Sequence, residues 1–266
     1  MSSKSSPSRR LIARLSALAL TAAVALGTTL VASPATAAPL VFAGLGDSYA
    51  SGVGAGDYIG SDDCYRSSHA YPKQVADAYG EYLYFNACSG AKVQDVIDNQ
   101  IGNISIAEHI TIGVGGNDAG FSRVLGACAG TDTALCLSQV EAANTFIRDE
   151  LPARLDTLYT KVGERTTYAD VAVVGNPRLF NGTTCAGTLA ITPEEQEALN
   201  GTADLLATTT KGVAADHGYR FVDPRDAFAS HAICSADPWL LGWTGSQLES
   251  FHPNVAGQNA YTDLLL

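Results

Sequence analysis

Segments typical of strands and segments typical of helices alternate along this chain, and the alternation restricts the fold more than any other feature. Five short apolar runs are rich in β-branched or aromatic residues, as buried strands are. The runs are 40–45, 82–87, 109–114, 171–175 and 219–222. Because alternating strands and helices place helices on both faces of a parallel sheet, we expect an α/β fold with a mainly five-stranded parallel sheet.

Three stretches between or after these runs have helical patterns. Residues 138–162 repeat apolar side chains at roughly helical spacing, which predicts one helix with a kink at Pro152. A second helix is predicted from a capping-box start at Thr192 toward Ala215. A short helix is predicted over 255–265.

Residues 1–38 have the pattern of a secretory signal peptide. A cationic start precedes an apolar stretch over 15–31, and residues 35–37 (Ala-Thr-Ala) form a small-residue cleavage signal. A membrane anchor is the alternative, but the stretch is short, rich in Ala and Thr, and ends at Pro34. We expect a secreted, extracellular protein whose residues 39–266 form a single domain; a pair of arginines in the cationic start leaves Sec and twin-arginine export both open.

The net charge of the full chain is −11 at pH 7, and the predicted signal peptide contributes only positive charge. The mature part is therefore still more acidic. Such a charge argues against nucleic acid as a partner and against electrostatic binding to anionic membranes. We expect a monomer that acts on a small-molecule or lipid substrate and has no stable membrane anchor.

All six cysteines lie in the mature part, which suggests three disulfides in an exported chain, although six cysteines can pair in many ways. A metal site is the competing interpretation. The chain has no Cys-x-x-Cys pair, no His-Glu-x-x-His string and only five histidines, so we expect no metal and no cofactor.

Four short motifs follow the predicted strands. Residues 46–49 (Gly-Asp-Ser-Tyr) follow the first run, residues 89–90 (Ser-Gly) the second and residues 115–118 (Gly-Gly-Asn-Asp) the third, while residues 251–254 (Phe-His-Pro-Asn) come after the fifth. Parallel sheets bind ligands at the carboxyl ends of their strands, beside the switch in strand order. The motifs therefore converge on one edge of the predicted sheet.

Serine, glycine, asparagine and histidine in this order resemble the SGNH (GDSL-type) hydrolase family. The resemblance implies a three-layer, flavodoxin-like sandwich and a serine ester hydrolase. It implies that Ser48 and His252 are catalytic and that the oxyanion hole consists of the N–H groups of Ser48 and Gly90 and the side-chain amide of Asn117. In secreted bacterial members neighbouring cysteines are paired, and sequence proximity favours the same pairs: Cys64 with Cys88, Cys128 with Cys136, and Cys185 with Cys234.

The chemistry fits these residue types. A serine hydroxyl is a poor nucleophile unless a base takes its proton during attack, and the histidine is the obvious base. Gly90 has no Cβ and lets a substrate approach its backbone, while Asn117 offers an uncharged N–H donor to a developing oxyanion.

The group that orients His252 departs from the family pattern. The family usually has an aspartate three residues before the histidine, and this chain has Glu249. The main-chain carbonyl of Ser250 is the other possibility, and the replacement of the usual aspartate favours it. Asp47 and Asp118 are expected to bind loop N–H groups and are not placed among the catalytic residues.

Apolar residues flank the predicted edge, namely residues 239–243 (Trp-Leu-Leu-Gly-Trp), Phe121 and Leu125, and they favour lipid esters as substrates. A carbohydrate acetyl esterase on the same fold is the alternative. A nucleotide- or flavin-binding protein is disfavoured because the glycines at 52, 54 and 56 do not complete a Gly-x-Gly-x-x-Gly motif. A non-catalytic binding module would not need all four motif residues.

Overall fold

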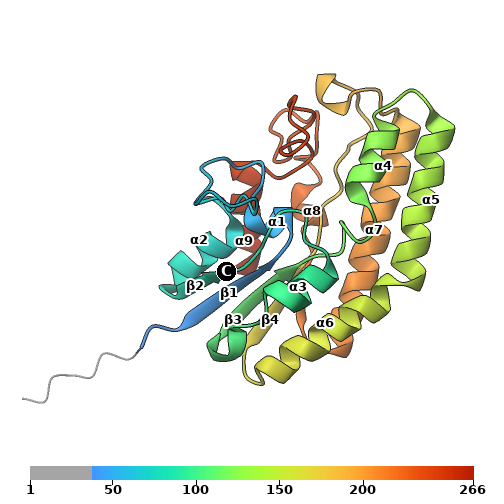
Figure 1. Cartoon of the computed structure of the whole chain (residues 1–266). Helices are drawn as coiled ribbons and strands as arrows, with labels where there is room; N and C mark the ends of the chain where they lie inside the picture. Colours follow the sequence, from blue (N-terminus) through green and yellow to red (C-terminus); the bar gives the residue numbers. More distant parts are fainter. Residues whose placement is uncertain (1–37) are drawn as a thin grey trace, which may run out of the picture. The chain divides into compact units, whose positions relative to one another are not determined.

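A parallel five-stranded sheet lies at the centre of the part of the chain that this computed structural model describes, residues 38–266 (Figure 1). The strands run in the order β2-β1-β3-β4-β5 and every pairing is parallel. They are β1 (Val41–Gly46), β2 (Tyr82–Phe85), β3 (His109–Gly113), β4 (Asp170–Val174) and β5 (Arg220–Val222). This is the flavodoxin-like strand order, with its switch point between β1 and β3, and it confirms the predicted fold. The predicted signal peptide falls outside the described residues, apart from Ala38.

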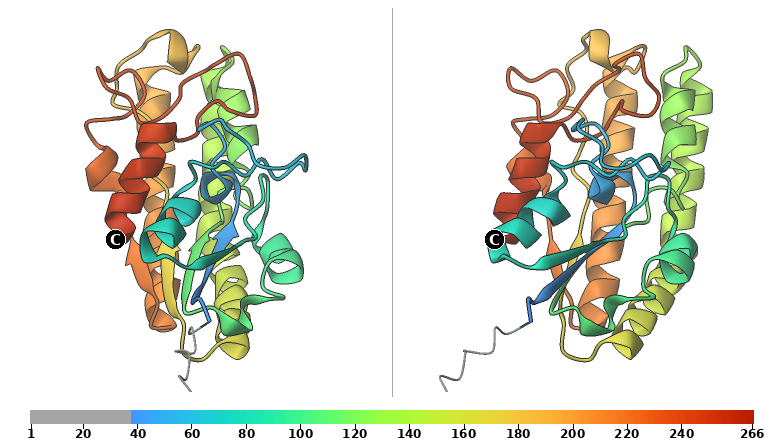
Figure 2. Two further views of the ribbon diagram at one scale, coloured as in Figure 1. Left: turned by 90° about the vertical axis from the view of Figure 1, so that its left-hand side faces the viewer. Right: turned by 60° about the vertical axis from the view of Figure 1, so that its left-hand side comes forward.

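Helices cover both faces of the sheet, as the two views of Figure 2 show. On one face α2 contacts α9, which contacts α8; on the other α3, α5 and α7 each contact α6, and α5 also contacts α4. The helices are α1 (Ser48–Ser51), α2 (Tyr71–Tyr79), α3 (Val93–Asn99), α4 (Phe121–Cys128), α5 (Thr133–Asp149), α6 (Leu151–Arg165), α7 (Pro193–Asp216), α8 (Arg225–Phe228) and α9 (Val255–Leu265). Two 3-10 turns, η1 (Ile104–Ile106) and η2 (Ala186–Thr188), complete the regular structure of this part of the chain.

The predicted helices at 192–215 and 255–265 are present as α7 and α9, and Thr192 and Glu195 form the capping box. The single helix predicted over 138–162 is wrong. The chain instead forms α5 and α6, which meet at Glu150. Pro152 has no N–H, and in a continuous helix its ring would collide with the carbonyl of Arg148, so a new helix begins beside it.

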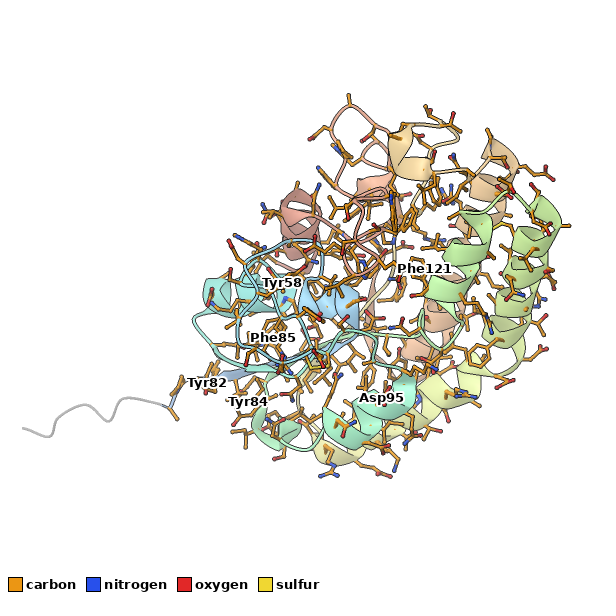
Figure 3. All side chains as sticks on the ribbon, turned by 45° about the horizontal axis from the view of Figure 1, so that its top comes forward. Tyr58, Tyr82, Tyr84, Phe85, Asp95 and Phe121 are labelled. Atoms are coloured by element: carbon orange, nitrogen blue, oxygen red, sulfur yellow. A yellow bond between two sulfur atoms is a disulfide. The ribbon has the colours of Figure 1, made fainter. Side chains whose placement is uncertain are left out.

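The central strands are buried on both faces, whereas β2 is an edge strand and exposes Tyr82 (labelled in Figure 3). Gly46 at the end of β1 is a position that only glycine fits. Its φ is +135°, and a Cβ there would lie 2.1 Å from the carbonyl oxygen of Gly113 in β3. The two strands therefore end in close contact, directly before Ser48.

The last helix holds the first one in place. Gln258 of α9 is fully buried, accepts a hydrogen bond from the Tyr71 N–H at 2.9 Å and donates one to the Tyr49 carbonyl at 3.1 Å.

Three disulfides add covalent links between loops, in the pairing that the family resemblance implies. They join Cys64 to Cys88, Cys128 to Cys136 and Cys185 to Cys234.

Candidate active site

Ser48 is the first residue of the four-residue helix α1 and is 8% exposed. The Asp47 carboxylate before it accepts a hydrogen bond from the Tyr49 N–H at 3.0 Å and so caps the helix. Gly52 ends the helix in the left-handed conformation, with φ of +86°. Burial raises the pKa of Asp47 to about 7, although the Tyr49 N–H lowers it in part. Asp47 therefore binds a backbone N–H group next to Ser48, which is the role expected for it.

His252 faces Ser48 with one ring nitrogen and Ser250 with the other. The Nε2 atom lies 2.8 Å from Ser48 Oγ, and Nδ1 lies 2.9 Å from the Ser250 carbonyl oxygen. A carbonyl can only accept a hydrogen bond, so the arrangement assigns the ring proton to Nδ1 and leaves the Nε2 lone pair directed at the serine hydroxyl. The hydroxyl is therefore poised to lose its proton to His252.

Tyr49 holds residues 249–254, the histidine loop, against the helix α1 that carries Ser48. Its hydroxyl donates to the Phe251 carbonyl at 2.7 Å, and its ring centroid lies 5.2 Å from that of His252. Sequence reasoning missed this residue, although it stands next to the serine in the Gly-Asp-Ser-Tyr motif.

Desolvation of the imidazole lowers the pKa of His252 to about 4, because burial outweighs the opposing hydrogen bond to Ser250. The ring is thus neutral at ordinary pH.

Glu249 does not hold the imidazole through its carboxylate. The carboxylate accepts a hydrogen bond from the Tyr58 hydroxyl at 2.8 Å, and that hydroxyl accepts one from the Gly54 N–H at 3.1 Å. Among residues 38–266 no hydrogen bond joins the Glu249 carboxylate to the His252 ring. Glu249 therefore links the histidine loop to the loop that follows α1, and the structure places the Ser250 carbonyl at the ring.

The expected oxyanion-hole residues follow three adjacent strands. Within the described chain, the backbone N–H groups of Ser48 and Gly90 have no hydrogen-bond acceptor. Asn117 donates one amide hydrogen to the Ala91 carbonyl at 3.1 Å, which fixes the amide beside Gly90 and leaves its second hydrogen available. Asp118 accepts the Val93 N–H at 3.0 Å, the loop-bonding role expected for it.

An apolar pocket opens beside Ser48 and Asn117. Helices α4, α5 and α7 and the segment after β4 supply its walls. Lining side chains include Val124, Ala143, Ile147, Leu179, Leu199 and Leu206. Phe121 (Figure 3) lines the pocket as expected, but Leu125 and residues 239–243 are absent from the described lining.

Residues 239–243 instead anchor the histidine loop. The Trp239 ring stacks on His231 with a centroid distance of 3.6 Å, and the Leu241 N–H donates to the His252 carbonyl at 2.9 Å. The segment therefore supports the loop that carries His252 and does not line the pocket. Within residues 38–266 no group of three or more His, Cys, Asp and Glu side chains could hold a metal ion, and no helix is long and apolar enough to cross a membrane.

Comparison with known proteins gives consistent matches. The sequence model of the GDSL-like lipase/acylhydrolase family matches residues 45–260. Lipase 1 of Streptomyces coelicolor is 40% identical over 259 residues, 94% of each chain. The crystal structure of phospholipase A1 from Streptomyces albidoflavus superimposes with a TM-score of 0.81 at 42% identity, over 86% of this chain and 98% of that one. An extracellular lipase from Streptomyces rimosus gives a TM-score of 0.81 at 37% identity, over 85% and 98%.

Proposed function

Since the chain belongs to the GDSL-like lipase/acylhydrolase family and is a carboxylic ester hydrolase, we propose that Ser48 is its nucleophile and His252 its general base. One observation carries the proposal. Ser48 Oγ, the His252 ring and the Ser250 carbonyl form a continuous hydrogen-bonded relay, with distances of 2.8 and 2.9 Å, at the mouth of an apolar pocket.

In the acylation step, Ser48 Oγ attacks the ester carbonyl carbon while His252 Nε2 takes the hydroxyl proton. The carbonyl electrons move to oxygen, and the resulting oxyanion accepts hydrogen bonds from the N–H groups of Ser48 and Gly90 and from the Asn117 amide. The bond to the alcohol oxygen then breaks. His252 returns the proton to the leaving alcohol, and the acyl group remains on Ser48.

In the deacylation step, water attacks the acyl carbon while His252 takes its proton. The bond between the acyl carbon and Ser48 Oγ then breaks, His252 gives the proton to Oγ, and the acid leaves. The Ser250 carbonyl accepts the Nδ1–H throughout, so it fixes the ring and stabilises the imidazolium that forms transiently. Burial keeps the resting ring neutral, the form that a base requires.

The apolar pocket supports lipid esters as the substrate class, cleaved by lipase or phospholipase A-type action. Each buried methylene contributes about 0.8 kcal/mol, so a pocket walled by three helices favours an acyl chain over a short acid. An acetyl group would leave the distant walls of the pocket unused, and no observation favours a carbohydrate acetyl esterase. The lipase and phospholipase names of the relatives support the same substrate class.

Export from the cell is part of the proposal. The extracellular lipase among the relatives and the three disulfides support it, together with the signal-peptide pattern of residues 1–38. Sequencing the N-terminus of the protein from culture medium tests it. Cleavage near Ala38 is expected, and an intact N-terminus would contradict this part of the proposal.

The catalytic assignment is tested with Ser48→Ala and a substrate panel of p-nitrophenyl esters, a triglyceride, a phospholipid and acetylated xylan. We expect Ser48→Ala to abolish turnover on every ester and to prevent labelling by a serine-reactive phosphonate. Ser68→Ala, a change at an exposed serine of the loop after α1, is the matched control and should retain full activity. Turnover that persists in folded Ser48→Ala protein would overturn the mechanism.

A further inference from the structure

The segment after β4, residues 176–183, forms one wall of the apolar pocket without being part of a helix or strand; we refer to it as the strap. Its side chains divide between two sides. Pro177 and Leu179 are buried and line the pocket, whereas Arg178 between them is exposed. Irregular backbone has few hydrogen bonds of its own, so a wall of this kind keeps its shape only where other elements bind it.

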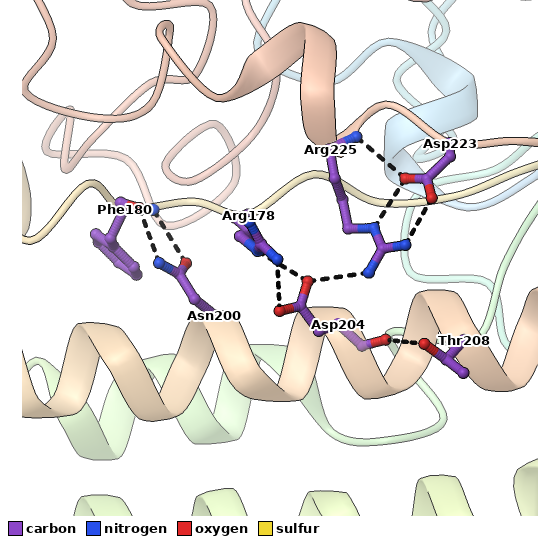
Figure 4. A network of polar contacts seen from close by, with 7 residues as sticks. All are labelled: Arg178, Phe180, Asn200, Asp204, Thr208, Asp223 and Arg225. Carbon is purple, nitrogen blue, oxygen red and sulfur yellow. Dashed lines mark hydrogen bonds and ion pairs between the residues drawn. The ribbon is translucent and has the colours of Figure 1, made fainter.

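Helix α7 supplies such binding from residues spaced four apart. Asn200 binds both backbone groups of one strap residue: it accepts the Phe180 N–H at 3.2 Å and donates to the Phe180 carbonyl at 2.8 Å (Figure 4). One turn earlier, Gln196 accepts the Gly182 N–H at 3.0 Å and donates to the Thr183 carbonyl at 3.1 Å. Two side-chain amides thus bind the strap on the α7 side, while on the other side Phe180 forms an isolated β-bridge with Ile233, whose N–H donates to the Leu179 carbonyl at 2.9 Å.

One turn later, Asp204 completes the series with an ion pair. Its two carboxylate oxygens accept the Arg178 Nε–H and Nη2–H, each at 2.8 Å, and one of them also accepts from Arg225 at 3.0 Å (Figure 4). Partial burial acts to raise the pKa of Asp204, but the hydrogen bonds from Arg178 and Arg225 outweigh it and hold the pKa below its usual value. The carboxylate stays ionised, and the bidentate geometry orients Arg178.

Gln196, Asn200 and Asp204 share one side of α7 because residues four apart lie on the same face of a helix. Leu199 and Leu206 on the same helix face the pocket. The helix therefore supplies one pocket wall and holds a second wall, the strap, in place. The strap also lies beside the histidine loop, since the Phe180 and Phe251 ring centroids are 6.3 Å apart.

We propose that Gln196, Asn200 and Asp204 are positioning residues that hold the strap rigid and thereby set which acyl groups the pocket accepts. The inference rests on the proposed function, because it takes the pocket as the acyl site. A fixed wall packs closely against a chain that fits and excludes one that is too wide. A loosened wall binds the fitting chain less well and admits wider chains, so selectivity between them declines.

Asn200→Leu is the decisive change, because it removes both strap hydrogen bonds with little change in shape. We expect the ratio of kcat/KM between the best straight-chain ester and a branched ester to fall about tenfold, mainly through KM, as for a loss of about 1.4 kcal/mol of discrimination. Turnover of p-nitrophenyl acetate, whose acyl chain is a single methyl group and gains little from packing against the pocket walls, should stay within about twofold.

Thr208→Val is the matched control. Thr208 lies one turn beyond Asp204 on α7, and its hydroxyl bonds only the Asp204 carbonyl of its own helix within the described chain (Figure 4). The selectivity ratio should therefore remain at the wild-type value. Arg178→Gln, at an exposed site, should lower the ratio by about threefold; it provides a second measurement if Asn200→Leu does not fold.

Two results would overturn the inference: an unchanged ratio in both folded variants, or an equal loss on acetate, straight-chain and branched esters, which indicates a merely structural role. Failure of the proposed function would look different. In that case neither the wild-type protein nor the Asn200→Leu variant would hydrolyse any ester, and the phosphonate would label Ser48 in neither.

Discussion

Replacing Glu249 by glutamine separates the two groups that can orient His252. In the structure the Ser250 carbonyl lies 2.9 Å from His252 Nδ1, and the Glu249 carboxylate is bound to Tyr58 instead. A glutamine amide oxygen can still accept a hydrogen bond from the Tyr58 hydroxyl. The change therefore removes a charge but keeps the link between the histidine loop and the loop after α1. We expect Glu249→Gln to lower kcat by less than about tenfold.

The magnitude follows from where the charge acts. In serine-protease triads, loss of a carboxylate bonded directly to the imidazole lowers kcat by about 10⁴, or about 5.5 kcal/mol. The Glu249 charge acts on the ring without a hydrogen bond and from a half-buried site, where such an interaction contributes about 1 kcal/mol or less. That corresponds to a decrease of about fivefold.

The assay is the initial rate on p-nitrophenyl butyrate, normalised to active enzyme by phosphonate titration and accompanied by a thermal melt. Asp57→Asn, which removes an exposed charge from the same loop as Tyr58, is the matched control and should retain the wild-type rate. Tyr58→Phe and its combination with Glu249→Gln complete a double-mutant cycle. If Glu249 acts only through Tyr58, the double variant should lose no more than Tyr58→Phe alone.

A loss of a hundredfold or more in folded Glu249→Gln protein would refute this reasoning. It would place the carboxylate at the imidazole during catalysis and make Glu249 the third member of a full triad.

Further consequences follow from the site and the disulfides. Burial lowers the pKa of His252 to about 4 and the neutral ring is the base, so kcat/KM should rise with pH to a half-maximum near pH 4; a midpoint above pH 6 would contradict this. Asn117→Ala should lower kcat by about 10²–10³ with little change in KM, whereas a change in KM alone would make the amide a binding group. Replacing Cys185 and Cys234 together by serine should lower the free energy of unfolding by about 2–4 kcal/mol in urea titrations, and an unchanged midpoint would count against it.

The sequence was sufficient to predict the sheet and the residues at its edge. Apolar runs and turn motifs are local signals, and Ser48, Gly90 and Asn117 each stand within a few residues of the end of a strand, so topology brings them together. His252 lies well beyond the end of β5, and only the packing of the loop before α9 brings it to Ser48. The break between α5 and α6 was harder to predict. Pro152 predicts a disturbance of the helix, but only packing decides whether a proline bends a helix or ends it.

Apart from Phe121, the pocket walls and the polar links around them have no local signal in the sequence. Ala143 and Leu199 look like ordinary core-facing helix residues, and only the packing of α5 and α7 turns them into a pocket wall. The contact between Tyr58 and Glu249 joins residues 191 positions apart, and no spacing rule relates a tyrosine to a glutamate over that distance. Such contacts belong to the tertiary structure and not to any pattern along the chain.

The separation between Ser48 and His252 also determines when activity can begin. The two residues are 204 positions apart, and α9, which follows the histidine, holds the backbone at Tyr49 through Gln258. A nascent chain that has emerged only as far as α7 contains the nucleophile, the glycine and the asparagine but lacks the base. On the proposed mechanism, translation must therefore pass residue 252 before an ester can be cleaved, so the enzyme is inactive through most of its own synthesis.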